Sequence, residues 1–436
     1  MLDEEKLRNL DKLSFEELAK LTGQTSDIFV NDSFPFSINL SLKGSNVDTL
    51  ITELIHTLKD KGYCNRTQRL DVHLKVILAN LIKGEEVYQH RYPFYSRHPN
   101  NYKYIRRYNP LNINFKPLIT CIDALVKLKF IKNYIGFYNP KTKRGKQSRI
   151  VIINNLFKLL EKHRVKKEQL YTLPIDPIRL KDSKGLLTDY KDTDAINKKR
   201  GMIEKHNKIL AKSSITLTKN PDTHRNRIVD FSNHSYHRIF NHNSFSLHGR
   251  FYGPWWQSLK SHEREHIKIN GEATVEKDYG SLHVHLAYSK LGIDYGRDND
   301  PYSIEGIDTK YREVIKLATL TSLNMKNAKY FSQTMTKRLQ EDGLYIPNVP
   351  YNDIKKAILK KHHPIKEFFF SGVGLELMYV DSCITEYIMK KFTTKKIPVL
   401  SIHDSYIVGK SYENLLIEIM TSAFRYYKLN SIPVIK

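Results

Sequence analysis

The sequence has few cysteines, no long apolar run and too few acidic residues to balance its basic ones. Its three cysteines, Cys64, Cys121 and Cys383, lie far apart and form no C-x-x-C pair, which argues against a disulfide framework or a cysteine-based zinc site. No apolar run reaches about 18 residues, so no transmembrane helix and no membrane partner are expected. Residues 1–20 lack the apolar core of a signal peptide. We therefore expect a cytoplasmic protein.

The charge is strongly one-sided. The 436 residues include 71 Lys and Arg against 46 Asp and Glu, a formal net charge of +25. Because 40% of the residues are hydrophobic, the chain is able to build real cores and is no basic tail. The excess favours a polyanionic partner. Abundant Lys, Ile, Asn and Tyr are also typical of an AT-rich genome, so codon usage explains part of the charge.

Periodicity and composition divide the chain into four parts. Residues 1–33 read as an amphipathic helix and a polar stretch, either a docking element for a small partner protein or a brace. Residues 34–165 read as a small basic α/β domain, and residues 166–229 as a charged linker with one or two helices. Residues 230–436 contain the aromatic clusters, the glycine signals and all the sharp motifs. The fold class expected from this order is α/β (α+β).

The second part contains a helix followed by a basic hairpin. An apolar helical pattern covers 115–130, strands are expected at 131–138 and 148–153, and a basic turn joins the strands. This order resembles a winged helix, in which the helix enters the major groove and the wing contacts phosphates. The alternative is a solvated hairpin tip. The candidate phosphate contacts on the wing are Lys141, Lys143, Arg144 and Lys146.

Two acidic residues stand where apolar strands end. Asp278 follows a short strand, and Gly280 and Ser281 then break the chain before an apolar helix. Asp404 stands at the tip of an expected β-hairpin. Two such carboxylates brought together can hold two divalent ions that clamp the attacking and leaving oxygens of phosphoryl transfer. Taken singly, an Asp in a turn is usually a turn or cap residue.

Cationic residues accompany these acids. Arg312 and Lys316 are four apart on the helix expected over 311–324, so both lie on one face. Such a pair can hold a triphosphate, or it can belong to a solvated basic face. Upstream, Gly249 permits a close backbone approach, and its neighbour Arg250 is a candidate for contacting a phosphate or a primer end.

Aromatic residues follow Arg250 directly. They are either core residues or a platform for a nucleic-acid base. For the two tryptophans, core packing is the favoured interpretation. The aromatic residues of this segment are Phe251, Tyr252, Trp255 and Trp256.

The order of these motifs resembles the palm and fingers of the family-A polymerases. The motifs are Ser-x-x-Gly-Arg, Asp-Tyr-Gly-Ser-Leu-His, Arg-x-x-x-Lys and His-Asp-Ser, and they span about 230–409. That superfamily includes bacterial DNA polymerase I and the single-subunit RNA polymerases. The sequence looks closest to the compact polymerase-like primases of mobile genetic elements. The resemblance implies a right-hand palm and fingers in the C-terminal half.

The resemblance also implies roles for individual residues. Asp278 and Asp404 would hold Mg²⁺ (or Mn²⁺), and the backbone carbonyl of Tyr279 would be a further metal ligand. Lys316 would also protonate the pyrophosphate leaving group. Residues implied in nucleotide binding are Arg312, Lys316, His283, Leu320 and Asn324, and residues implied in contacts to template or primer are Gly249, Arg250 and His403.

Three departures from the family pattern bear on the sugar. His283 replaces a Glu that crowds the ribose 2′ position in family-A DNA polymerases, and Asn324 replaces a sugar-sensing Tyr. Ser405 follows the second Asp, as in the RNA polymerases. These changes favour acceptance of ribonucleotides. The alternative is that His283 packs in the palm and Asn324 caps a helix.

The function that these features favour is a primase, which starts primers de novo on single-stranded DNA during replication of a mobile element, plasmid or phage. Its partners would be the template and primer, nucleoside triphosphates, and either a replicative helicase or a small accessory protein. The alternatives are a primer-dependent family-A DNA polymerase of low processivity and an inactive DNA-binding replication initiator. A two-metal nuclease, with Glu276 as a further acid, is the last alternative.

Overall fold

The computed structural model describes residues 33–63, 69–88, 91–102, 105–139, 144–219, 221, 229–341, 343 and 349–436. The helix expected within 1–33 lies outside these residues, except for Ser33. The chain forms two compact units. The first contains Met1–Asp176 and Asp222–Asp230, and the second contains Pro177–Pro221 and Phe231–Lys436.

The first unit is a mixed α/β layer. Its four-stranded sheet has the order β1–β3–β7–β4, parallel between β1 and β3 and antiparallel elsewhere. Two-stranded ribbons β2–β8 and β5–β6 accompany it. The helices are α4 (Ser45–Asp60), α5 (Leu70–Ile82), α6 (Phe115–Lys127) and α7 (Asn154–Lys162); the strands are β1 (Ser33–Pro35), β2 (Leu40–Leu42), β3 (Tyr92–Tyr95), β4 (Ile131–Tyr134), β5 (Phe137–Asn139), β6 (Arg144–Lys146), β7 (Ser148–Ile152) and β8 (Leu170–Thr172).

Apolar spacing explains why the helices of this unit pack as they do. On α6, Leu118, Ile122 and Leu125 recur at i, i+4 and i+7 and are fully buried. The same stripe on α4 buries Leu50, Leu54 and Leu58. One apolar cluster contains side chains of both helices and of α5 and β7.

The expected order of a helix followed by antiparallel strands is confirmed in this unit, while residues 140–143 of the basic turn lie outside the described residues. Helix α6 leads into β4 and β5, and β6 and β7 return antiparallel to them. Lys141 and Lys143 lie outside the described residues. Arg144 begins β6 and Lys146 ends it. Contact of this hairpin with nucleic acid stays a prediction.

The second unit contains two sheets. Their orders are β10–β9–β12–β13 and β11–β14–β15–β17–β16. The strands are β9 (Ile178–Lys181), β10 (Leu187–Thr188), β11 (Ile215–Leu217), β12 (His237–Phe240), β13 (His248–Tyr252), β14 (Ile267–Ile269), β15 (Glu272–Asp278), β16 (Leu400–Ile402) and β17 (Ser405–Gly409).

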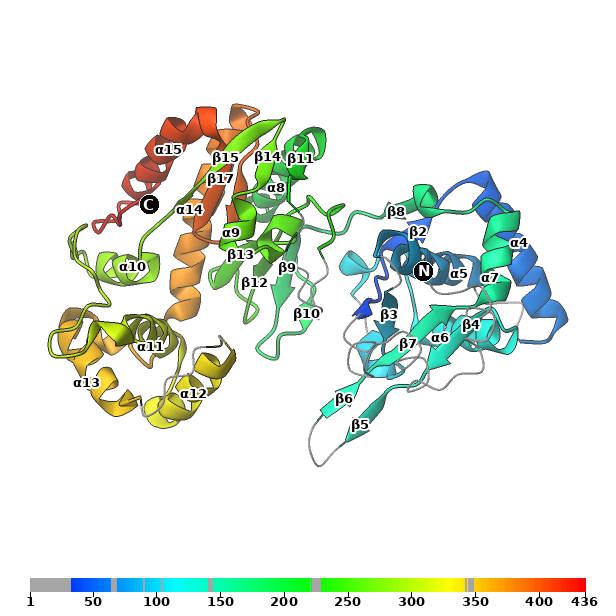
Figure 1. The fold of residues 1–436 in the computed structure, drawn as a ribbon, viewed down its shortest axis with the longest axis horizontal. Helices are drawn as coiled ribbons and strands as arrows, with labels where there is room; N and C mark the ends of the chain where they lie inside the picture. Colours follow the sequence, from blue (N-terminus) through cyan, green and yellow to red (C-terminus); the bar gives the residue numbers. More distant parts are fainter. Residues whose placement is uncertain are drawn as a thin grey trace. The chain divides into compact units, whose positions relative to one another are not determined.

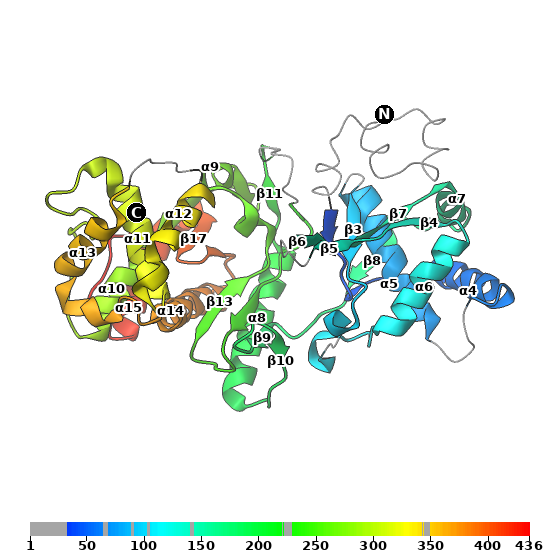
Figure 2. The same cartoon turned by 90° about the horizontal axis from the view of Figure 1, so that it is seen from below.

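Helices surround these sheets. In Figure 1 the long helix α14 runs from the group formed by α10–α13 to the sheets, where it packs against β13. Figure 2 shows α11, α12 and α13 gathered at the same end of this unit. The helices are α8 (Asp194–Lys212), α9 (Ser261–Arg264), α10 (Leu282–Lys290), α11 (Arg312–Asn324), α12 (Phe331–Glu341), α13 (Tyr351–Lys361), α14 (Gly374–Thr394) and α15 (Glu413–Tyr426).

The division of the chain differs from the boundaries at 165/166 and 229/230 that the sequence suggested. Part of the expected linker, from Pro177 to Pro221, belongs to the second unit. The reason is a sparse apolar pattern within polar sequence. Ile178 and Leu180 alternate inward on β9, and α8 buries Ile203 and Leu210. These few side chains suffice to anchor the segment.

The tryptophans belong to the core. Trp255 is 3% exposed and Trp256 is fully buried. The indole Nε1 of Trp256 donates a hydrogen bond of 2.8 Å to the Tyr236 hydroxyl, and this hydroxyl in turn donates to the Ser401 carbonyl. The ring of Trp256 also packs edge-on against Trp255. Their role is therefore packing, as favoured from the sequence.

Within the part of the chain that the structure describes, no helix has both the length and the apolar character needed to cross a bilayer.

Candidate active site

Strand register brings the two expected acids together. Strand β15 pairs antiparallel with β17, and the last residue of β15, Asp278, stands opposite Ser405 (Figure 1). Ser405 directly follows Asp404, which with His403 forms the two-residue turn between β16 and β17. The Tyr279 amide donates to the Asp404 carbonyl at 3.4 Å. Residues 278 and 404, far apart in sequence, thus lie at one end of the same strand pair.

The turn geometries on both sides explain why these acids lie at the strand ends. His403 adopts a left-handed φ of 57°, which reverses the chain within two residues. Ser281 adopts φ 55° at the N-cap of α10, so the chain leaves β15 sharply. Beyond Asp278, the chain pairs with its last residues: Gly280 donates to the Val434 carbonyl at 2.8 Å.

The two aspartates are half-buried, and the charge of Asp404 repels that of Asp278. Burial, the charge of Asp404 and the charge of Glu276 raise the pKa of Asp278 to about 7, while Lys316 opposes that rise. Burial and the charge of Asp381 likewise raise the pKa of Asp404, opposed by Arg250. Lys316 and Arg250 only partly offset the negative charge at the two carboxylates, and a divalent cation would offset it further.

A third acid, Asp381 on α14, organises the residues around Asp404. Its carboxylate is 1% exposed and accepts from Arg250 at 2.8 Å through Nε and at 2.6 Å through Nη2. Nη2 of Arg250 also contacts Nε2 of His283 at 3.0 Å. Burial alone would raise the pKa of Asp381, but Arg250 and His283 outweigh it and hold the pKa below its usual value. Arg250 is thus held inside the site by Asp381.

His403 stands on the other side of the same cluster. Burial and the charge of Arg250 lower its pKa to about 4, so its imidazole is neutral near pH 7. The ring packs edge-on against Tyr252, with 5.6 Å between the centroids. Its Nδ1 is buried without a hydrogen-bond partner in the described structure. A neutral imidazole has one donor and one acceptor nitrogen, so Nδ1 of His403 keeps an unused hydrogen-bonding capacity.

Gly249 permits β13 to lie close to α14. Its φ is +72°, and a Cβ there would lie 2.7 Å from Oγ of Ser382 and 3.0 Å from the ring of Phe240. Arg238, fully buried beside it, donates to the Gly249 carbonyl at 2.6 Å. The position therefore serves packing, and through packing it places Arg250.

Helix α11 presents the expected cations on an accessible face. The side chains of Arg312 and Lys316 are 41% and 48% exposed. Arg312 pairs with Asp300 at 2.8 Å and with Glu313 at 2.9 Å, whereas Lys316 lies 3.9 Å from Glu313. Lys316 is near enough to Asp278 to lower that pKa. Lys316 is thus the cation of this helix that interacts with Asp278.

The remaining predicted residues differ in their surroundings. Leu320 is half-buried on the same stripe as Lys316. Asn324 donates to the Leu320 carbonyl at 2.7 Å and lies against Gly374, where an added Cβ would come within 2.1 Å of its Oδ1. The side chain of Tyr279 is 1% exposed and donates to the Met420 carbonyl. Only the backbone of Tyr279 is therefore available to the site.

The donor set fits a magnesium ion. Mg²⁺ is commonly held by one or two carboxylates, with water and substrate phosphates completing its shell. Asp278 and Asp404 provide two carboxylates whose pKa values are raised by burial and then by neighbouring negative charge. Among the described residues no group of three or more His, Cys, Asp or Glu is arranged to hold a metal. A site here would therefore depend on substrate phosphates for further ligands.

Glu276 is already occupied by neighbouring residues. It accepts two hydrogen bonds from Arg264, at 2.9 Å and 2.6 Å, and another from the Ser405 hydroxyl. Its charge reaches Asp278, but its oxygens are committed to Arg264 and Ser405. This arrangement weighs against Glu276 as a further metal ligand.

Sequence reasoning missed Asp381, Asp300 and Tyr302. Asp381 stands within an apolar helical pattern, and an acid at such a position is a signal because charge is rarely buried without a partner. Asp300 and Tyr302 lie in a polar segment that carries no such signal. Tyr302 is 3% exposed, and the Arg312 guanidinium lies 5.6 Å from its ring centroid.

Comparison with known proteins gives a distant structural likeness. No protein-family model matches the chain, and no curated protein matches it. Among solved structures, the chain is similar to the POL domain of Pol1 from M. smegmatis in complex with DNA primer-template and dNTP. The TM-score is 0.30 and the identity 10%, over 99% of this chain and 70% of that chain. A TM-score of 0.30 is too low to carry any inference about activity.

Proposed function

We propose that the protein is a template-directed nucleotidyltransferase that starts primers de novo on single-stranded DNA. The observation that supports this most strongly is the pairing of β15 with the β16–β17 hairpin. It brings Asp278 and Asp404 to one strand end, and Lys316 of α11 interacts electrostatically with Asp278. Two carboxylates beside an accessible cation suit phosphoryl transfer from a triphosphate.

In this proposal the two aspartates bind the metal ion and the cations of α11 bind the triphosphate. Asp278 and Asp404 would hold Mg²⁺ (or Mn²⁺), which stabilises the charge on the attacking and leaving oxygens when bound. Lys316 donates to the triphosphate and can protonate the pyrophosphate leaving group. Arg312 contributes a second contact once it exchanges Asp300 for a phosphate.

Ribonucleotide acceptance is part of the proposal. His283 is buried, and its Nε2 contacts Arg250, which Asp381 in turn holds. The imidazole therefore has a fixed place and cannot swing as a free side chain would. We expect this position to tolerate a ribose 2′-hydroxyl, which primer synthesis requires.

The decisive experiment is synthesis on unprimed single-stranded DNA with labelled nucleotides and Mg²⁺. Asp278→Ala and Asp404→Ala should each lower incorporation by roughly a thousandfold or more, the equivalent of several kcal/mol of lost stabilisation. The matched control is Glu418→Ala, which removes an exposed acid from α15 and should leave incorporation unchanged. Full activity in both aspartate variants would overturn the proposal.

The same assay separates the alternatives. Products made only from an annealed primer would favour a primer-dependent polymerase of low processivity. Template binding without incorporation of any nucleotide would favour an inactive replication initiator. Metal-dependent shortening of the template would indicate a nuclease, which the pairing of Glu276 with Arg264 makes the least supported alternative.

A further inference from the structure

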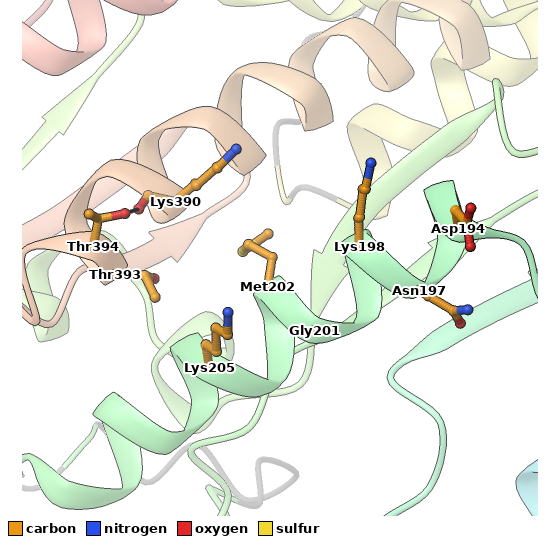
Figure 3. Close-up of a pocket in the computed structure, with 9 residues that line it drawn as sticks. All are labelled: Asp194, Asn197, Lys198, Gly201, Met202, Lys205, Lys390, Thr393 and Thr394. Atoms are coloured by element: carbon orange, nitrogen blue, oxygen red, sulfur yellow. Dashed lines mark hydrogen bonds between the residues drawn. The ribbon is translucent and has the colours of Figure 1, made fainter.

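A groove between α8 and α14 contains lysines that the candidate active site does not use. It has a volume of about 710 Å³. Lys198, Met202 and Lys205 project into it from one side of α8, and Lys390 comes from α14 (Figure 3). Met202 is buried and forms an apolar floor, whereas the three lysines are exposed.

The groove lies away from the two carboxylates. Lys390 follows Asp381 by nine residues on α14. At about 3.6 residues per turn, nine residues make two and a half turns, so the two side chains leave opposite faces of the helix. Asp381 faces Arg250 and the candidate active site. A ligand in the groove would therefore not occupy the catalytic centre.

The lysines of the groove carry uncompensated charge. Among the described residues, no acidic oxygen lies within 4.0 Å of the ammonium groups of Lys198, Lys205 or Lys390. Their neighbours differ, because Lys199 pairs with Glu386 at 3.0 Å and Arg200 with Asp192 at 2.5 Å. Helix α8 as a whole has six basic residues against two acidic ones. Three free cations facing one groove repel each other unless an anion is bound there.

One carboxylate also lines the groove. Asp194 stands at the first residue of α8 (Figure 3), where a negative charge is favoured by the helix dipole. It lies one turn before Lys198 along the helix. The other polar side chains of the lining are Asn197 of α8 and Thr393 and Thr394 of α14. The Thr394 hydroxyl donates to the Lys390 carbonyl at 2.9 Å.

We propose that this groove binds the sugar-phosphate backbone of a nucleic-acid strand, as a contact separate from the catalytic centre. The proposal rests on the proposed function only for the choice of polyanion. Among the described residues, none that lines the groove is aromatic, so these residues offer bases no ring to stack on. The contacts are with phosphates and do not depend on base sequence.

The test compares two triple variants. In one, Lys198, Lys205 and Lys390 become Ala. In the other, the exposed residues Lys268, Lys410 and Arg425 become Ala, which removes the same charge elsewhere on this unit. Affinity for a labelled single-stranded DNA oligonucleotide is measured without nucleotide over a series of salt concentrations. Thermal unfolding of each variant checks that it is folded.

The groove variant should bind roughly 10- to 100-fold more weakly at low salt, and the slope of log K against log[salt] should become shallower by about 2, since each phosphate contact on single strands contributes about 0.7. The control variant should change the slope less. Replacing the three lysines with Arg should restore both quantities. Equal losses in the two Ala variants, or no loss in the groove variant, would overturn the proposal.

The outcomes separate this proposal from the proposed function. If the groove variant binds DNA weakly but Asp278→Ala leaves incorporation intact, the groove stands and the assigned catalytic site fails. If Asp278→Ala abolishes incorporation while the groove variant binds DNA normally, the catalytic site stands and the groove fails. If the groove instead binds an acidic polypeptide, the groove variant would bind DNA normally, and this result would also overturn the proposal.

Discussion

The charged side chains that the strands place in the candidate site are mostly buried, whereas those of helix α11 are almost half exposed. On the strand side, Arg250 is bonded to Asp381 and His283, and both partners are buried. On the helix side, Arg312 and Lys316 are almost half exposed, and their partners lie near the surface. Buried, mutually bonded charges keep one geometry, which suits a preorganised catalytic centre. Exposed cations can change partners, which suits the entry of a ligand.

The largest expected effect concerns the buried ion pair between Asp381 and Arg250. Asp381→Ala leaves the Arg250 guanidinium buried without its carboxylate, which should cost about 3–5 kcal/mol of unfolding free energy. The control is Asp300→Ala, which breaks the more exposed pair with Arg312 and should cost about 1 kcal/mol or less. Urea unfolding at neutral pH measures both. Equal losses would mean that burial does not distinguish the two sides.

The second prediction concerns Asp278, whose substitution should stabilise the folded protein rather than destabilise it. The pKa of Asp278 is raised to about 7 from its usual value of 3.8, so the folded protein binds that proton more tightly than the unfolded chain does. Stability from this group is therefore lost as the pH rises between those two values, and above pH 7 its ionisation costs at most about 4 kcal/mol.

Asp278→Asn should therefore stabilise the protein at pH 8 without added metal, while abolishing incorporation. The gain should shrink as the pH falls below 7, because the native carboxyl is then neutral as well. Thermal unfolding at several pH values measures it, with Glu418→Gln as the exposed control. If the Asp278→Asn variant were less stable than the wild type at pH 8, the ionised Asp278 carboxylate would not be destabilising the folded protein.

These two aspartates also show what a sequence is able to reveal. Asp278 and Asp404 were predictable because local signals mark them: an apolar strand, then Gly280 and Ser281 or a two-residue turn. Asp381 was not, because its meaning depends on a partner 131 residues away that β13 brings against α14. The same limit applies to the segment from 177 to 221, whose few buried side chains join a sheet formed largely by later residues.

The pairing of Arg312 illustrates a further limit. Its position four residues before Lys316 was visible in the sequence and correctly indicated one helix face. The sequence did not reveal that Asp300, in a loop without regular structure, accepts from Arg312 through both carboxylate oxygens. Loop conformation is set by tertiary packing, so periodicity does not predict such contacts.

The third prediction concerns the loss of folding stability at low pH that is caused by the buried His206. His206 is fully buried between Thr393 and the Val399 carbonyl, and burial lowers its pKa to about 4. The unfolded chain takes up this proton near pH 6.5 and the folded protein does not. Stability is therefore lost as the pH falls from 6.5 to 4, by at most about 3 kcal/mol from this group.

His206→Gln should flatten that loss. The variant is less stable at neutral pH, because its hydrogen bonds are imperfectly replaced, but its stability should fall less between pH 7 and pH 5. Exposed His363 provides the control, since His363→Gln should leave the acid dependence unchanged. If both variants follow the wild-type curve, the buried imidazole is not the group that titrates.

The smallest expected effect concerns the exposed cations of α11, Arg312 and Lys316. Lys316→Ala should lower kcat/KM for the nucleotide roughly 10- to 100-fold, the loss of one charge-assisted hydrogen bond to phosphate. Arg312→Ala should cost less, because Arg312 must first leave Asp300 and Glu313. Asp300→Asn should then lower KM slightly, since it releases Arg312 for the ligand. Steady-state kinetics on a fixed template measures all three variants. If Arg312→Ala costs more than Lys316→Ala, or Asp300→Asn raises KM, the Asp300 pair is part of the productive geometry and α11 is as preorganised as the strands.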